Sequence, residues 1–270
     1  IVEIKSVNSK LIKEHKIVIL SKVYEVRSIL IAKFCSDNNI DFGIDIFDNY
    51  FNIFEKRILN QNSYWINKIL DLCSFAICST EYTKNIIRHY NKNLKIHILE
   101  DSVESKKFDS PLKLSRIPSK RKSLKVLWFG IGDNPYFDVG LHDLIISSYN
   151  LIKLSSLNLE VELSILTNKR SLTIEKLIHI KNSFNFKYTI DEWSLLKEEE
   201  HLNKCDLVYL PVGFSTFSRA KTPNRVLTSL FSGTQVLNTG YELYSEFEKF
   251  IYKSPEEYLI DLKLNKFKLN

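Results

Sequence analysis

Residues 209–240 read YLPVGFSTFSRAKTPNRVLTSLFSGTQVLNTG and carry the clearest fold signal in this chain. This stretch begins with the apolar end of a strand and passes through a polar loop into a helix that ends at Gly233. A second apolar run follows, so the order strand–helix–strand predicts a crossover between two parallel strands. Thr222 is the expected N-cap of the helix, and Pro223 is expected at its first position.

Four polar residues stand at this helix start and form the best candidate site. They are Arg219, Lys221, Asn224 and Arg225. A helix N-terminus has unpaired N–H groups, and cations beside it favour a bound anion such as a diphosphate. Ligands bind at the carboxyl ends of parallel strands, where this cluster is expected to lie. A solvated basic turn that caps the helix and binds nothing is the alternative.

The same alternation of short apolar runs and amphipathic stretches extends over the chain and predicts an α/β fold with parallel sheets. Strands are expected at 16–20, 41–47, 74–78, 94–99, 124–129, 160–166, 186–189, 207–211 and 235–238. Helices are expected at 26–37, 50–70, 81–90, 141–154, 173–184, 193–203 and 223–232. Between the two sets lies a linker at 106–125 with eight basic residues and one acid. We therefore expect two Rossmann-like domains, 1–118 with the linker and 119–270, facing a cleft.

Composition places the chain among ordinary globular proteins. Its 270 residues are 44 % apolar and 12 % aromatic, which excludes disorder as the main state. The net charge of +6 suits an anionic ligand but is too small to indicate nucleic acid by itself. The four cysteines have no zinc-site spacing, and no apolar run reaches the ~20 residues that a membrane-spanning helix needs. The chain starts at Ile1 and contains no Met, so we expect a piece of a longer protein with a small or truncated N-terminal domain.

Five segments, in order, resemble GT-B glycosyltransferases, above all the family 4-like enzymes of polysaccharide synthesis. IDIFDNYF (44–51) is similar to a D-x-x-D-aromatic segment of the N-terminal domain, and CSTEYTKNII (78–87) to a strand-to-helix turn there. ILEDSVESKKF (98–108) resembles the stretch that precedes the interdomain linker. LKVLWFGIGDNPYFDVGLHDLI (124–145) resembles the first strand and helix of the C-terminal domain, and KTPNRVLTSLFSGTQVL (221–237) its donor-nucleotide segment.

The resemblance implies transfer of a sugar from a nucleotide-sugar donor, which is a substrate rather than a cofactor, to a cell-surface polysaccharide or another glycan. Arg219, Lys221 and Arg225 would hold the phosphates, and Asn224 and Thr222 would orient them. Gly130 and Gly132 would let a phosphate or the acceptor approach the main chain closely. Fixed cations and helix N–H groups stabilise a leaving phosphate without a metal ion, so we expect none.

The chain departs from the family at two positions. Family 4 enzymes that retain configuration carry two Glu eight residues apart, and Ala220 and Thr228 stand there. The first Glu of the pair contacts the sugar and the second the ribose, so the handling of the sugar and the stereochemistry stay open. Lys221, one position on, is an alternative phosphate contact.

Asp45 and Asp48 are the candidate catalytic residues, since a carboxylate at a strand end could act as general base on an acceptor hydroxyl. The alternative is that Asp48 caps the helix expected at 50–70.

Several functions stay open from the sequence. A non-catalytic domain that binds a nucleotide sugar or glycan within a larger assembly is one, and a GT-B-like nucleotide-sugar epimerase is another. Gly130-Ile131-Gly132 lacks the third glycine of a dinucleotide fingerprint, so a dehydrogenase is disfavoured. We expect a cytoplasmic protein, with the basic linker and tail either solvated or at the inner face of an anionic membrane that carries a lipid-linked acceptor.

Overall fold

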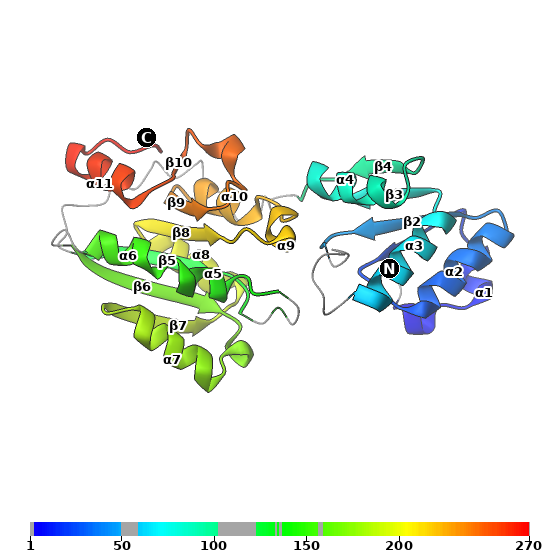
Figure 1. Ribbon diagram of the computed structural model, residues 1–270, viewed down its shortest axis with the longest axis horizontal. Helices are drawn as coiled ribbons and strands as arrows, with labels where there is room; N and C mark the ends of the chain where they lie inside the picture. The colour runs from blue at the N-terminus through cyan, green and yellow to red at the C-terminus, as the bar shows by residue number, and fades with distance from the viewer. Residues whose placement is uncertain are drawn as a thin grey trace. The chain divides into compact units, whose positions relative to one another are not determined.

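The computed structural model describes residues 3–49, 59–101, 123–132, 134, 137–155 and 159–269, and the chain divides into two compact units. The first unit comprises Ile1–Asp101 with the short segment Arg219–Thr222, and the second comprises Ser102–Ser218 with Pro223–Asn270. Figure 1 shows one sheet with its helices in each unit. The linker expected at 106–125 and the domain boundary expected at 118 lie outside the described residues, except for 123–125.

The first unit is built on a four-stranded parallel sheet. Its strands are β1 (Ile17–Ser21), β2 (Asp41–Ile46), β3 (Phe75–Cys78) and β4 (Lys95–Ile98), in the order β1-β2-β3-β4. Its helical segments are η1 (Ile4–Ser6), α1 (Ser9–Lys13), α2 (Val26–Asp37), α3 (Leu59–Leu72) and α4 (Glu81–Tyr90).

The core of the first unit joins α2 and α3 to the sheet. Trp65 of α3 is buried, and its indole N–H donates to the hydroxyl of Ser28 on α2 at 2.7 Å. The α4 helix begins at an N-cap, since the hydroxyl of Thr80 accepts from the N–H of Thr83 at 3.1 Å. Local capping and long-range packing therefore agree on where these helices lie.

The second unit is built on a six-stranded parallel sheet. Its strands are β5 (Ser123–Phe129), β6 (Glu160–Thr167), β7 (Lys187–Glu192), β8 (Leu207–Val212), β9 (Gln235–Gly240) and β10 (Ile251–Tyr252), in the order β10-β9-β8-β5-β6-β7. Its helical segments are α5 (Leu141–Ile146), α6 (Ser148–Ser155), η3 (Lys169–Ser171), α7 (Ile174–Ser183), α8 (Leu195–Lys204), α9 (Thr216–Arg219), α10 (Asn224–Phe231), η4 (Ser245–Phe247) and α11 (Pro255–Leu264).

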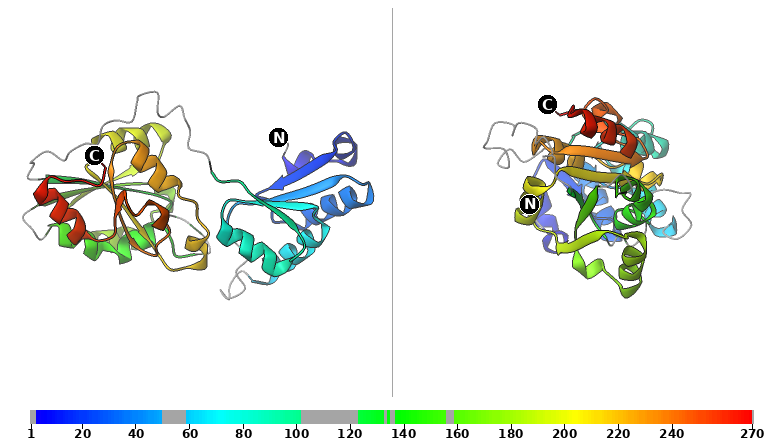
Figure 2. Two further views of the ribbon diagram at one scale, coloured as in Figure 1. Left: turned by 90° about the horizontal axis from the view of Figure 1, so that it is seen from above. Right: turned by 90° about the vertical axis from the view of Figure 1, so that its left-hand side faces the viewer.

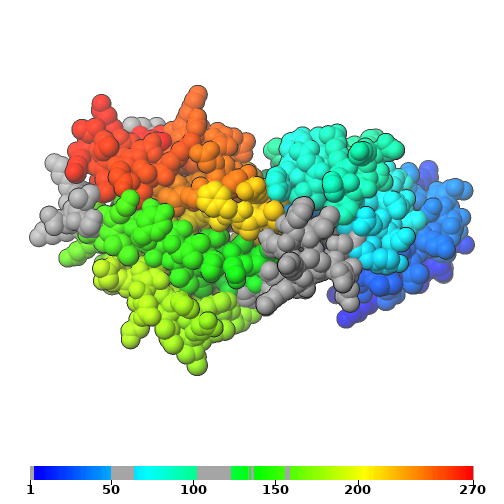
Figure 3. Space-filling model, in the orientation of Figure 1, coloured from blue at the N-terminus to red at the C-terminus, as the bar shows by residue number. Residues whose placement is uncertain are grey.

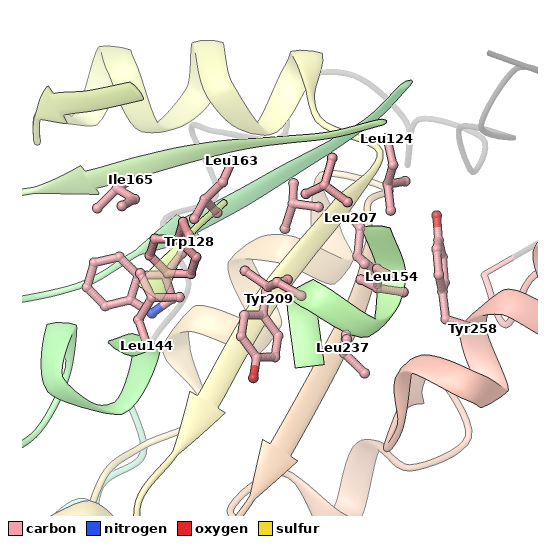
Figure 4. Packing of buried hydrophobic residues seen from close by; sticks show 14 of the residues in the cluster. Leu124, Trp128, Leu144, Leu154, Leu163, Ile165, Leu207, Tyr209, Leu237 and Tyr258 are labelled. Atoms are coloured by element: carbon pink, nitrogen blue, oxygen red, sulfur yellow. The ribbon is translucent and has the colours of Figure 1, made fainter. Parts of the chain in front are cut away.

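Both faces of the second sheet are covered by helices, as Figure 2 shows from two further directions. Trp128 of β5 belongs to a core with α5, α6, α7 and α11, whereas Leu127 belongs to a core with α8 and α10. Figure 4 shows the first of these cores from close by, and Figure 3 shows the surface that α5, α6 and α7 form. Burial on both faces explains why β5 and β8 read as nearly continuous apolar runs in the sequence, whereas the edge strand β7 is partly exposed and more polar.

The α/β prediction is confirmed, with differences at particular elements. The single helix expected at 141–154 is wrong, because α5 and α6 separate at Ser147. The described part of the helix expected at 50–70 is α3, which begins at Leu59. The segments α1, α9, β10 and α11 were not expected.

Candidate functional site

The candidate site lies at the carboxyl end of β5, beside β8. In the second sheet β5 has β6 on one side and β8 on the other, so the order of strands along the chain reverses between β5 and β8. Open parallel sheets bind ligands outside the carboxyl ends of their strands at such a reversal. The loop that follows β5 contains Gly130 and Gly132, which the sequence had already singled out.

Arg225 reaches this edge from the first turn of α10. Its Nη1 atom donates to the main-chain oxygen of Phe129, the last residue of β5, at 3.3 Å. This bond uses one of the five N–H donors of the guanidinium. The ion pairs within the described part of the chain do not include Arg225. Arg225 therefore keeps its charge and most of its donors available to an anion at the end of β5.

The start of α10 differs from the prediction by one residue. The helix begins at Asn224, and Pro223 is its N-cap. The expectation that Thr222 caps this helix is wrong, because its hydroxyl donates to the carboxylate of Asp101 at 2.7 Å. Asn224, as the first helical residue, stays at the end of α10 where the N–H groups lack helical partners.

Lys221 and Arg219 belong to the segment that groups with the first unit. The Nζ atom of Lys221 lies 2.5 Å from Oδ1 of Asp48, and both side chains are half-buried. Arg219 ends the short helix α9. Of the three cations predicted to contact phosphate, Arg225 is therefore the one that belongs to the second unit. It lies at the end of β5 and makes no ion pair with a described residue.

The two candidate catalytic acids have different partners. Asp45 is in β2, and its Oδ2 atom accepts from the hydroxyl of Ser21 in β1 at 2.7 Å. Asp48 follows β2 and pairs with Lys221. The start of the helix that Asp48 was expected to cap lies outside the described residues. Asp45 thus accepts a hydrogen bond from a neutral hydroxyl, whereas a cation neutralises Asp48.

Both main-chain polar groups of Gly132 make hydrogen bonds to side chains. Its N–H donates to Oδ1 of Asn168 at 2.9 Å, and its carbonyl accepts from Nζ of Lys176 at 2.6 Å. Beside it a cavity of about 530 Å³ opens between α5 and α7. This volume is within the range of small-molecule sites. Its lining includes Asn134, His142, Lys176 and His179.

Asp143 was missed by the sequence analysis, although it lies at the centre of this edge. It is an acid of α5 that is only 4 % exposed, and its Oδ2 atom accepts from the N–H of Gly140 at 2.9 Å. Burial raises the pKa of its carboxyl group, while the Gly140 N–H, Arg225, His142 and the Gly213 N–H oppose that rise. A Gly-x-x-Asp spacing at a helix start was the available signal, since an acid at this position accepts from the capping N–H.

Two further observations bear on the chemistry. Among the residues that the structure describes, no group of three or more His, Cys, Asp and Glu side chains is arranged to hold a metal ion. Within the same ranges, the helices are too short or too polar to cross a membrane.

Comparison with known proteins identifies the architecture. No protein-family model matches the chain, and no curated protein sequence matches it. The UDP-forming α,α-trehalose-phosphate synthase of Burkholderia vietnamiensis is similar in structure, with a TM-score of 0.62, 8 % identity and coverage of 94 % of this chain and 67 % of that one. The E. coli trehalose-6-phosphate enzyme bound with UDP-2-fluoro glucose gives a TM-score of 0.63 at 8 % identity, covering 92 % and 64 %.

A third similar structure is a variant of TarM from S. aureus in complex with fondaparinux, α-GlcNAc-glycerol and UDP. Its TM-score is 0.59 at 14 % identity, and the match covers 96 % of this chain and 50 % of that one. This chain therefore spans between half and two thirds of the length of these three proteins. All three are GT-B glycosyltransferases, so the expected GT-B fold is confirmed.

Proposed function

This chain has the GT-B fold, and we propose that it is a glycosyltransferase that moves a sugar from a nucleotide-sugar donor to a glycan acceptor. The observation that carries this proposal is the half-buried Arg225 at the carboxyl end of β5, whose guanidinium gives one donor to Phe129 and keeps the others free of ion pairs with the described residues. A guanidinium of this kind suits the phosphate groups of a nucleotide.

Glycosyl transfer requires stabilisation of the negative charge that develops on the leaving phosphate. In the transfer, the bond between the anomeric carbon and the phosphate oxygen breaks, and a bond from the acceptor oxygen to that carbon forms. The nucleoside diphosphate or monophosphate leaves with the electron pair, and the acceptor hydroxyl gives up a proton. A fixed cation and oriented N–H groups favour the leaving phosphate without reorganisation. Arg225 and the start of α10 supply both.

On the acceptor side, the contacts support Asp45 over Asp48 as the general base. A general base needs a carboxylate that can take a proton, and Asp48 already pairs with the ammonium of Lys221. Asp45 is oriented by the Ser21 hydroxyl and keeps its second oxygen outside that hydrogen bond. We keep Asp45 as the first candidate and Asp48 as the second.

The similar structures suggest which nucleotide to test first. Their descriptions name UDP formation, UDP-2-fluoro glucose and UDP. We propose a nucleoside diphosphate sugar as donor and a hydroxyl of a surface polysaccharide or a lipid-linked glycan as acceptor. Transfer to such an acceptor would take place in the cytoplasm, at the inner face of the membrane.

A non-catalytic nucleotide-binding domain is the second candidate. The observation that favours it is the pair Ala220 and Thr228, which occupy the positions of two Glu in retaining family 4 enzymes. Such a domain would bind the same donor and transfer nothing.

The deciding experiment titrates the protein with UDP, GDP, CDP and dTDP and follows its melting temperature. A ligand that binds the folded state raises the unfolding free energy by about 2.7 kcal/mol at one hundred times its Kd. Arg225→Gln, which keeps length but removes charge, should lose the stabilisation. A matched control is Arg170→Gln, which removes a charge from η3 in the same unit. If no nucleotide stabilises the wild-type protein, the proposal is wrong.

Incubation with the corresponding nucleotide sugars then separates the remaining candidates. Slow release of free nucleoside diphosphate or monophosphate indicates a transferase, and an isomerised sugar indicates an epimerase. Binding without turnover indicates the non-catalytic domain.

A further inference from the structure

Asp143 is a charged residue buried in the second unit without a direct ion pair to any described cation. It lies in the first turn of α5 and is 4 % exposed. An acid so deeply buried costs free energy unless hydrogen bonds and nearby charges compensate it. The groups that offset the cost of burying the Asp143 carboxylate therefore indicate its role.

Two loops at the candidate site lie against its carboxylate. The N–H of Gly140, in the loop after β5, lies 2.9 Å from Oδ2. Gly213, directly after β8, lies close to the other carboxylate oxygen, and its N–H opposes the rise in the pKa of Asp143. A β-carbon on Gly213 would lie 2.5 Å from Oδ1, so a side chain there would collide with the acid. Asp143 thus joins the loops that follow the two strands at the reversal of strand order.

The backbone conformation at position 140 requires glycine. Its φ is +70°, and a β-carbon would lie 2.2 Å from the carbonyl oxygen of Ile131. Glycine is the residue that adopts this conformation at low cost. The carboxylate of Asp143 therefore accepts from an N–H group in a loop whose backbone conformation only glycine adopts at low cost.

Two side chains, those of Arg225 and His142, lower the pKa of Asp143 through their charge. Arg225 attracts the carboxylate through space, while its Nη1 atom stays hydrogen-bonded to the carbonyl of Phe129. The attraction between the two charges opposes movement of the guanidinium away from the carboxylate, and such attraction is strong where water is excluded.

We propose that Asp143 is a positioning residue, which fixes the loops of Gly140 and Gly213 and holds the guanidinium of Arg225 toward the phosphates of a bound nucleotide. The inference rests on the proposed function, because it assigns the anion at Arg225 to a nucleotide. Asp143 itself does not touch that nucleotide. Its effect on binding passes through Arg225 and the two loops.

The test measures the affinity of whichever nucleoside diphosphate stabilises the wild-type protein most, by calorimetric titration. Asp143→Asn keeps the shape of the side chain, removes its charge and turns one acceptor into a donor. We expect about tenfold weaker binding or more, with the protein still folded. Ser254→Ala is the matched control, since it removes the N-cap of α11 in the same unit, where the Ser254 hydroxyl accepts from the Glu257 N–H at 3.2 Å. It should cost comparable stability, about 1 kcal/mol, without changing affinity.

A double-variant comparison shows whether Asp143 acts through Arg225. In the Arg225→Gln background, Asp143→Asn should weaken binding much less than it does in the wild type, because the guanidinium that it positions is gone. Full additivity of the two effects would contradict the inference. Should Asp143→Asn fail to fold, Gly213→Ala serves instead, because it displaces the carboxylate and leaves its charge in place.

The pH dependence of binding gives a separate readout. Protonation of Asp143 removes its charge, so wild-type affinity should fall at acid pH more steeply than the affinity of Asp143→Asn. Titration of the ligand affects both proteins equally. Repeating the comparison with His142→Gln added to both the wild type and Asp143→Asn removes the contribution of the imidazole. Equal affinity and equal pH profiles in wild type and Asp143→Asn would reduce Asp143 to a helix cap. A wild-type protein that binds no nucleotide would instead refute the proposed function, and the inference with it.

Discussion

A β-carbon on Gly130 would lie 3.1 Å from Nη1 of Arg225 and 3.0 Å from the indole ring of Trp128. Trp128 is fully buried in the core between the sheet and α5, so its ring cannot yield. The guanidinium is the movable neighbour. Gly130 therefore determines how closely Arg225 approaches the main chain at the end of β5.

Substitution Gly130→Ala should accordingly weaken nucleotide binding by about tenfold while costing at most about 1–2 kcal/mol of stability. The methyl group displaces the guanidinium and its hydrogen bond to Phe129. Calorimetric titration measures the affinity, and denaturant unfolding of the same variant measures the stability. Unchanged affinity would show that the position of Arg225 does not matter for the ligand.

Lys221→Ala distinguishes a phosphate contact from an ion-pair partner. If Lys221 contacts phosphate, as the sequence predicts, the variant should bind nucleotide at least tenfold more weakly. If its role is the pair with Asp48, affinity should stay the same and stability should fall by about 1 kcal/mol or less. Lys197→Ala is the matched control, since Lys197 pairs with Asp191 at 2.9 Å.

Gly43→Ala tests packing in the first unit. Gly43 of β2 lies opposite Phe75 of β3, and a β-carbon on it would lie 2.2 Å from the phenyl ring. We expect a loss of about 1–3 kcal/mol in the free energy of unfolding, because the ring must move. Phe75→Leu should reduce that loss when both changes are combined. A double variant no more stable than the additive sum would rule out the contact as the cause.

The central strands β5 and β8 were predictable because their apolar runs are buried on both faces, and α2 and α4 were predicted with their observed bounds. The break between α5 and α6 was not predictable from periodicity, which continues across Ser147. There the carbonyl of Ser147 accepts from the hydroxyl of Tyr209 at 2.9 Å. The same carbonyl also accepts from the N–H of Asn150 at 3.2 Å, so a partner 62 residues away and a local one meet where the two helices separate.

The candidate site was predictable as far as local signals reach. The cations and glycines at strand ends were identified from residue type and spacing. The partner of Thr222 was not, because Asp101 is 121 residues away along the chain. For Asp143 the Gly-x-x-Asp spacing is a local signal of a helix cap, but its contact with Gly213, 70 residues along the chain, was not predictable. Contacts across the fold decide which polar groups are already paired and which are left for a ligand.

Tyr209 offers a test at alkaline pH. Its hydroxyl is buried, accepts from Nδ2 of Asn150 at 3.1 Å, lies 2.9 Å from Oγ1 of Thr239, and donates to Ser147. Figure 4 shows the ring of Tyr209 among the apolar side chains of the core. Burial raises the pKa of Tyr209 to about 12, against about 10 in an unfolded chain. The phenol of the unfolded state therefore ionises first as the pH rises, and this favours unfolding.

Tyr209→Phe should be less stable than wild type by about 1–2 kcal/mol at neutral pH, because Asn150 and Thr239 lose a partner. That difference should shrink as the pH rises from about 9 to 11, since wild type alone pays for keeping this phenol neutral when folded. Denaturant unfolding of both proteins across this range measures it. The pKa values of Tyr252 and Tyr258 are raised too, but these residues are present in both proteins and cancel in the difference. A stability difference that stays constant with pH would show that the Tyr209 phenol ionises equally readily in the folded and unfolded states.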